Sequence, residues 1–145
     1  MKIRIIHGPN LNLLGKRETK IYGTTSLDAI NQMLSALAKK ENVLIDFFQS
    51  NHEGALIDNI QESMDCDGLV INPAAYTHTS IALRDALLAI GRPFVEIHLS
   101  DPKKREAFRQ HSFFSDIALK VFSGQGPQSY IQGLEFLIDS LRKKD

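Results

Sequence analysis

The sequence has a single cysteine and no excess of either charge, since Lys and Arg together match Asp and Glu at 17 each. Cys66 alone rules out a disulfide framework and a thiolate metal cluster, and such cysteine usage is typical of a reducing cytoplasm. The balanced charge lacks the basic excess that a duplex-binding protein needs, so nucleic acid is not an expected partner. No apolar run approaches the roughly 20 residues that cross a bilayer, and no export signal is recognisable, so a cytoplasmic protein without membrane contact is predicted.

Several common site motifs are also missing. The sequence has no acidic pair with EF-hand spacing, no His-x-x-x-His, no Walker lysine motif and no nucleophile elbow. Metal, phosphoryl-transfer and hydrolase-triad sites therefore lack their usual support. The turn Gly124-Gln125-Gly126 could meet a phosphate, but two glycines before a helix more simply form a helix entry. General acid-base catalysis is the chemistry that is left.

Short runs rich in Ile, Val and Phe alternate with longer stretches of helical period. The expected strands are 2–7, 43–49, 68–72, 93–98 and 117–122. This alternation predicts an α/β fold, a flavodoxin-like doubly wound sheet of about five parallel strands with helices on both faces. With no repeat or linker in 145 residues, a single catalytic domain over residues 1–145 is expected.

Four helices are predicted from apolar spacing and end signals. The first follows Ser26 as N-cap and ends at Lys39-Lys40, and the last begins at Pro127 and ends in a basic run. Ser50 and Glu53 have the spacing of a capping box for the second helix. The buried stripes predicted for the second and third helices comprise Leu56, Ile57, Ile60 and Met64, then Leu83, Leu87 and Ile90.

The segment between the first strand and the first long helix is longer than an ordinary βα turn, for which about 2–6 residues suffice. We therefore expect a lid loop over about residues 14–25. Arg17 and Tyr22 lie within it. A phenol becomes a usable base only if a nearby cation lowers its pKa, and Arg17 is placed to do that. The alternative is that Tyr22 only anchors the loop by packing.

Amides and imidazoles follow four of the predicted strands, and ligands bind at the carboxyl ends of parallel strands. In chain order these residues are Asn10 and Asn12, then Gln49, Asn51 and His52, then Asn72, Tyr76 and His78, then Glu96 and His98. Glu96 and His98 are two apart on one strand, so they share a face and the carboxylate can orient and charge the imidazole. On these two residues alone, a histidine that merely ends a strand beside an ion pair is an equal alternative.

Five motifs in register resemble the type II dehydroquinases along nearly the whole chain. They are Gly8-Pro9-Asn10-Leu11-Asn12-Leu13-Leu14-Gly15, Arg17-Glu18 with Ile21-Tyr22-Gly23, Gln49-Ser50-Asn51-His52-Glu53-Gly54, Ile71 to Ser80, and Glu96-Ile97-His98-Leu99-Ser100, followed by Arg105, Phe108, Arg109 and His111-Ser112. The resemblance implies a flavodoxin-like enzyme that reversibly dehydrates 3-dehydroquinate to 3-dehydroshikimate, in the shikimate pathway or quinate breakdown. It also implies that neither a metal nor another cofactor takes part.

By this resemblance Tyr22 removes the proton beside the ketone, and Arg17 stabilises the tyrosinate. His98 protonates the departing hydroxyl, Glu96 positions His98, and Asn10 with an ordered water holds the enolate intermediate.

The remaining likenesses concern substrate binding and assembly. They place Asn72 and the backbone amides of Leu99 and Ser100 on the substrate carboxylate, and His78 with Arg109 on the ring hydroxyls. Asp85 resembles an aspartate that reaches into a neighbouring subunit's site, and trimers gathered into a dodecamer are implied. Arg105 resembles a second arginine near that site, with a surface ion pair as an equal alternative.

The chain departs from the family pattern at Thr19-Lys20 in the lid loop and at Asp101-Pro102, where Asp is a sound N-cap before Pro. Two other functions of the same fold fit less well. A flavoprotein needs a Ser/Thr-rich phosphate loop after the first strand, and a phosphoacceptor domain needs acidic residues where this chain has Asn10 and Asn72.

Overall fold

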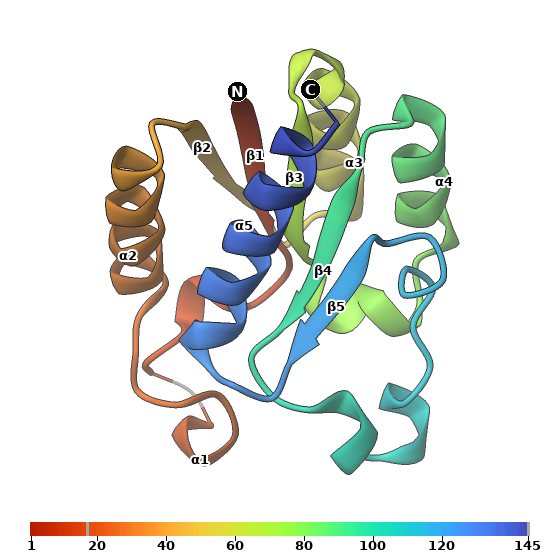
Figure 1. Ribbon diagram of the computed structural model, residues 1–145. Coiled ribbons are helices and arrows are strands. Elements are labelled where there is room, and N and C mark those ends of the chain that lie inside the picture. The colour runs from red at the N-terminus through yellow and green to blue at the C-terminus, as the bar shows by residue number, and fades with distance from the viewer. Residues whose placement is uncertain (17, 145) are drawn as a thin grey trace.

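The computed structural model describes residues 1–16 and 18–144, and a parallel sheet runs through its centre (Figure 1). Its strands are β1 (Lys2–His7), β2 (Leu44–Gln49), β3 (Gly68–Asn72), β4 (Phe94–His98) and β5 (Lys120–Ser123). The order is β2-β1-β3-β4-β5, with every neighbouring pair parallel. This order confirms the predicted flavodoxin-like fold, and it puts the reversal of strand order between β1 and β3.

Helices cover both faces of the sheet (Figure 1). Those on the faces are α2 (Leu27–Lys40), α3 (Glu53–Glu62), α4 (Ile81–Ile90) and α5 (Pro127–Arg142), while the short α1 (Thr19–Tyr22) lies beyond the edge of the sheet. α2 and α5 lie on one face, and α3 and α4 on the other. Short 3-10 turns, which carry many of the site residues, follow β1, β3 and β4 at 11–13, 74–78, 102–104 and 107–109.

Alternation along the strands produces two apolar cores. Ile3 and Ile5 of β1 point toward α2 and α5, whereas Ile6 points toward α3 and α4. Gly133 brings α5 close to β4, because a Cβ at this position would lie 2.3 Å from Cδ1 of Ile97. The burial of Ile, Val and Leu side chains on both sides of the sheet is the main stabilising term of such a fold.

The predicted starts of α2 and α5 are confirmed. The Ser26 hydroxyl accepts a hydrogen bond from the Ala29 N–H. At the start of α4, for which no cap was predicted, the Ser80 hydroxyl accepts one from the Leu83 N–H. α5 begins at Pro127, whose missing N–H costs nothing in the first turn of a helix. The Asp101 carboxylate caps the short turn that starts at Pro102.

The capping box predicted for α3 is wrong. The N-cap is His52, so the Ser50 hydroxyl lies outside the helix and accepts from the N–H of His52 at 3.0 Å. Met64, predicted to be buried, is 60% exposed because the helix has already ended at Glu62.

β5 starts later than the predicted 117. The N–H groups of Ile117 and Ala118 both donate to the carbonyl of Phe114 at 3.0 Å, so this stretch is turned rather than extended. The first strand of the sheet after that turn is Lys120–Ser123.

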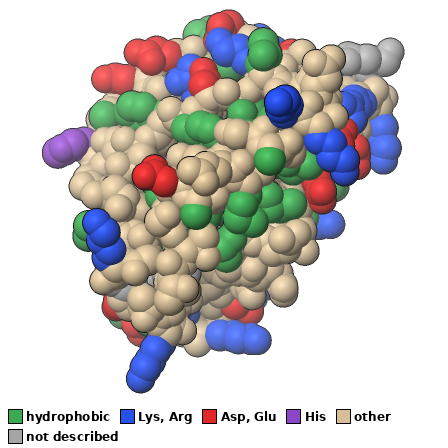
Figure 2. Space-filling model, turned by 90° about the vertical axis from the view of Figure 1, so that its left-hand side faces the viewer, with side chains coloured by type: hydrophobic (Ala, Val, Ile, Leu, Met, Phe, Trp, Pro, Cys, Tyr) green, Lys and Arg blue, Asp and Glu red, His purple; other side chains and the backbone are tan. Residues whose placement is uncertain are grey.

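Basic and acidic side chains are mixed on the side of the molecule that carries α2, with apolar side chains between them (Figure 2). Within residues 1–16 and 18–144, no helix combines the length and the apolar character needed to cross a membrane.

Candidate active site

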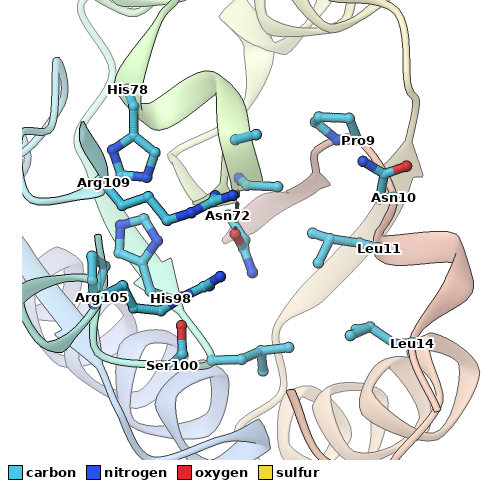
Figure 3. A pocket seen from close by; sticks show the side chains of 14 residues that line it. Pro9, Asn10, Leu11, Leu14, Asn72, His78, His98, Ser100, Arg105 and Arg109 are labelled. Atoms are coloured by element: carbon cyan, nitrogen blue, oxygen red, sulfur yellow. Dashed lines mark hydrogen bonds between the residues drawn. The ribbon is translucent and has the colours of Figure 1, made fainter. Parts of the chain in front are cut away.

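A cavity of about 140 Å³ opens at the carboxyl ends of β1, β3 and β4, at the predicted edge of the sheet (Figure 3). Three segments of the chain line it: Pro9, Asn10, Leu11 and Leu14 after β1; Asn72, Ala74, Ala75 and His78 at the end of β3 and beyond; and His98, Leu99, Ser100, Pro102, Arg105 and Arg109 from β4 onward. Its size favours a small metabolite over a nucleotide.

The polar lining is cationic. Arg105 and Arg109 lie on the same side of the cavity as His78 and His98, opposite the loop that carries Asn10 (Figure 3). Among the described residues that line this cavity there is no Asp or Glu. Such a lining favours an anionic ligand, because guanidinium and imidazole donors bind carboxylates strongly. Arg109 also pairs with Glu106 at 2.8 Å, outside the lining.

His98 is held from behind by Glu96, as predicted. The Nε2 atom of His98 lies 2.7 Å from Oε1 of Glu96, and the Glu96 side chain is completely buried. Burial opposes ionisation of this carboxyl, but hydrogen bonds from His98, Ser112 and Ser115 outweigh it, so the pKa of Glu96 lies below its ordinary value. The carboxylate therefore accepts the proton of Nε2, and Nδ1 is the free nitrogen of the ring.

Two serines complete the support of Glu96. The Ser112 hydroxyl donates to Oε1 and the Ser115 hydroxyl donates to Oε2, each at 2.6 Å. Neither serine was predicted from the sequence to have a role. Their separation from Glu96 by 16 and 19 positions leaves no local pattern that could have indicated the contact.

His78 is fixed in one tautomer. Its Nδ1 atom lies 2.7 Å from the carbonyl oxygen of His111, and a carbonyl can only accept, so Nδ1 carries the proton. Burial and the neighbouring His98 and Arg109 lower the pKa of His78, although the carbonyl raises it in part. A neutral ring protonated at Nδ1 leaves Nε2 as a hydrogen-bond acceptor.

Asn72 ends β3 and is nearly buried, with 3% of its surface exposed. Its Oδ1 atom accepts from the N–H of Ala74 at 3.1 Å. The amide oxygen is therefore engaged by the backbone, and the amide NH₂ is the part of Asn72 that remains for other partners.

The backbone after β4 lines the same cavity at Leu99 and Ser100. The carbonyl of Leu99 accepts from the N–H of Gly126 at 2.9 Å. Because the peptide bond between Leu99 and Ser100 is trans, the Ser100 N–H points away from that contact. The Ser100 carbonyl is held in turn by Gly124 at 3.1 Å.

Asn10 lies in the left-handed region, with φ 67°, which asparagine tolerates better than most residues. Its N–H donates to Oδ1 of Asn51 at 2.9 Å, and the Gln49 amide donates to the same oxygen at 3.2 Å. Gln49 and Asn51 thus hold the loop that carries Asn10, although neither lines the cavity.

Other predicted residues lie apart from the cavity. His52 and Tyr76 do not line it, and Asp85 lies on the exposed side of α4. Arg17 lies outside the described residues, and so does the side chain of Tyr22, whose backbone ends α1. A second hollow lies between this part of the lid loop and the start of α5, and its lining includes Ile21, Gly23 and Pro127.

In the part of the chain that the structure describes, no group of three or more His, Cys, Asp or Glu residues could hold a metal ion.

The chain is similar to one group of enzymes throughout its length. The family model described as "Dehydroquinase class II" matches residues 1–138. A 3-dehydroquinate dehydratase of Acaryochloris marina is 55% identical over 141 residues, which cover 97% of this chain and 95% of the relative. One from Haemophilus influenzae is 54% identical over 144 residues, covering 99% and 97%.

Solved structures show the same similarity in three dimensions. The type II dehydroquinase from Butyrivibrio crossotus matches with a TM-score of 0.92 at 44% identity, covering 94% of this chain and 97% of that one. The type II dehydroquinase from Propionibacterium acnes matches with a TM-score of 0.90 at 34% identity, covering 95% and 96%.

Proposed function

Because the chain belongs to the class II dehydroquinase family, we propose that it reversibly dehydrates 3-dehydroquinate to 3-dehydroshikimate, with Tyr22 as base and His98 as acid. The chain is a type II dehydratase, as its curated relatives are 3-dehydroquinate dehydratases that match it over almost their whole length. The reaction belongs to the shikimate pathway, with quinate breakdown as the other use of the same step.

The buried Glu96–His98 pair is the observation that best supports this mechanism. The Glu96 carboxylate stabilises an imidazolium, and Nδ1 is left to deliver a proton. In the first step the Tyr22 phenolate takes a proton from the carbon beside the ketone, and Arg17 stabilises the phenolate. The electron pair passes to the ketone oxygen, where Asn10 and a water hold the enolate. In the second step the enolate collapses, the hydroxyl leaves on the opposite face, and it takes the His98 proton to become water.

The cationic lining supports the binding of a carboxylate substrate. We assign the carboxylate to the NH₂ of Asn72 and the N–H groups of Leu99 and Ser100. We assign the ring hydroxyls to His78 and Arg109. A His78 ring with a free Nε2 acceptor suits a hydroxyl, which can donate to it. Each proton transfer in this scheme has a side chain assigned to it, so it requires no cofactor.

We further propose that the protein is a homo-oligomer, with trimers assembled into a dodecamer. Support comes from the outer face of α4, where Ile81 and Leu88 are 56% and 53% exposed on the same side as Asp85. Large exposed apolar side chains beside a charged residue are typical of subunit interfaces. We also propose a cytoplasmic location, which the single Cys66 favours, and neither nucleic acid nor membrane as a partner.

The rise of the product's conjugated enone absorbance after addition of 3-dehydroquinate tests the proposed activity. Tyr22→Phe should lose at least the ~10² to 10⁴-fold in turnover that removal of a general base costs. Tyr76→Phe is the matched control, because it removes a phenol hydroxyl that lies outside the cavity and bonds to the Asn51 carbonyl. Near-normal turnover of Tyr22→Phe under saturating substrate would exclude Tyr22 as the base, and folded wild-type protein without any absorbance change would exclude the activity itself.

A further inference from the structure

A network of buried polar side chains adjoins the cavity through Asn72. His7 at the end of β1 is 1% exposed, Tyr130 on α5 is completely buried, and Asn72 ends β3. His7 and Asn72 are partners in the parallel register of β1 and β3, so their side chains leave the same face of the sheet. α5 packs over that face and places Tyr130 against both. Only Asn72 of the three lines the cavity.

The backbone N–H of Ala74 fixes the direction of the hydrogen bonds in this network, because it can only donate. The Asn72 atom 3.1 Å from this N–H is therefore the amide oxygen. The Asn72 NH₂ is then the part of the amide that faces the Tyr130 hydroxyl, where it favours the ionised form and partly offsets the rise that burial causes in the pKa of Tyr130. An amide NH₂ cannot accept a hydrogen bond, so the Tyr130 proton must go to another partner.

That partner is His7. Its Nδ1 atom lies 2.8 Å from the Tyr130 hydroxyl oxygen, and its Nε2 atom lies 2.8 Å from Oδ1 of Asn31 on α2. A ring that donates from Nε2 to the Asn31 oxygen has a bare Nδ1, which accepts the Tyr130 proton. In this arrangement the Tyr130 hydroxyl donates to Nδ1 of His7, and Nε2 of His7 donates to the Asn31 oxygen.

The charge states keep this arrangement in place. Burial lowers the pKa of His7 to about 4, even though the bond to Asn31 opposes the shift, so the ring is neutral at neutral pH. Burial also raises the pKa of Tyr130, so its hydroxyl keeps its proton. A buried network with all of its groups satisfied is rigid, and it costs free energy to rearrange.

We propose that His7 and Tyr130 are positioning residues that fix the Asn72 amide so that one N–H points into the cavity and binds the substrate carboxylate. Tyr130 takes one of the two Asn72 protons and the Ala74 N–H holds the oxygen, so the amide can neither flip nor rotate. This inference rests on the proposed function, because that function assigns the substrate carboxylate to Asn72.

Tyr130→Phe tests the proposal because it removes only the hydroxyl. The Asn72 amide loses its restraint, and substrate binding should weaken. We expect the Michaelis constant to rise about tenfold, as for partial loss of one hydrogen bond to a charged group. The turnover number should fall by less than about threefold, since the carboxylate contact is the same in ground and transition states. Ser140→Ala is the matched control, since it removes another hydroxyl hydrogen bond of α5, to the carbonyl of Phe136.

A double-mutant cycle separates positioning from a general loss of stability. In the Asn72→Ala background, adding Tyr130→Phe should leave the Michaelis constant unchanged within about twofold, because there is no amide left to position. A further tenfold rise in that background would overturn the proposal, and so would a folded Tyr130→Phe with a wild-type Michaelis constant. Wild-type protein without dehydratase activity would instead refute the proposed function, so the two failures are distinguishable.

Variants of His7 provide a second route if Tyr130→Phe does not fold. His7→Leu removes the acceptor of the Tyr130 proton and should raise the Michaelis constant. In His7→Asn the side-chain amide oxygen can take the place of Nδ1, so this variant should restore a Michaelis constant within about threefold of wild type. Equal Michaelis constants for the Leu and Asn variants would contradict the proposed role of His7.

Discussion

The imidazole of His98 and the carboxylate of Glu96 are joined by a hydrogen bond of 2.7 Å on one face of β4. Ser112 donates to the same carboxylate oxygen, and Ser115 donates to the other. The carboxylate is completely buried, whereas the ring reaches the cavity. An ionised Glu96 orients the ring, and we propose that it also stabilises the positive charge that the ring carries as an acid.

Glu96→Gln should therefore reduce turnover by roughly 10²-fold with little effect on substrate affinity, because the amide cannot stabilise an imidazolium. Steady-state kinetics with 3-dehydroquinate measure both parameters. Ser115→Ala is the control, since it removes a hydrogen bond to the other oxygen and keeps the charge. Wild-type turnover in Glu96→Gln would mean that His98 needs no carboxylate.

His98→Ala should slow loss of the hydroxyl more than removal of the proton. Substrate incubated with this variant in deuterated water should still take up deuterium beside the ketone, while enone formation falls by about 10² or more. Mass spectrometry of the recovered substrate measures the exchange. If exchange and product formation fall together, His98 also takes part in proton abstraction or in binding.

His78 should be neutral and protonated on Nδ1 at neutral pH. The carbonyl of His111 requires a proton on that nitrogen, and burial holds the pKa of His78 below its ordinary value. Nitrogen chemical shifts of the labelled ring, assigned by their disappearance in His78→Asn, report the tautomer. An imidazolium, or a ring protonated only on Nε2, would contradict the acceptor role assigned to it.

The burial of His7 predicts how stability depends on pH. The pKa of His7 is about 4 in the folded protein and 6.5 for an ordinary histidine, so between these values the unfolded chain binds more protons. The free energy of unfolding should be unaffected above pH 6.5 and fall by roughly 3 kcal/mol as the pH drops to about 4.

Urea denaturation across this range measures the effect. His7→Asn should show a shallower pH dependence than wild type, while His78, whose pKa is also lowered, contributes equally to both proteins. Identical slopes for the two proteins would show that His7 is not the group that titrates.

Asp85→Ala should raise the Michaelis constant or loosen the assembly, because we propose that Asp85 acts across a subunit boundary. Light scattering after size exclusion, combined with kinetics over a range of protein concentrations, distinguishes the two effects. Asp139→Ala is the matched control, an exposed aspartate on α5. An active monomer that Asp85→Ala leaves unchanged would refute the assignment.

The sequence by itself determined the fold class and the edge of the sheet that carries the site. The alternation of apolar runs with helical periods predicted the five strands, and the placement of Asn72 and His98 at strand ends predicted that they meet. Both follow from local periodicity and the geometry of parallel sheets, which short stretches of sequence encode. The Glu96–His98 contact could also be predicted from the sequence, because both residues lie on one strand, two positions apart.

Two predicted element boundaries were wrong because the chain forms a different local hydrogen bond from the one that the spacing suggested. The Ser50–Glu53 spacing matched a capping box, yet the N-cap of α3 is His52, and the Ser50 hydroxyl accepts from the N–H of His52. The late start of β5 depends on a turn closed by the Phe114 carbonyl.

Only the tertiary structure decided what surrounds the predicted site residues. Ser112 and Ser115 reach Glu96 from a different segment, and Tyr130 reaches His7 across 123 positions. These hydrogen bonds depend on how α5 and the segment at 112–115 pack against the sheet. No spacing along the chain encodes that packing. The sequence named Asn72, His78 and His98 among the residues that line the cavity, whereas the packing of α5 and of the segment after β4 determines how such residues are held.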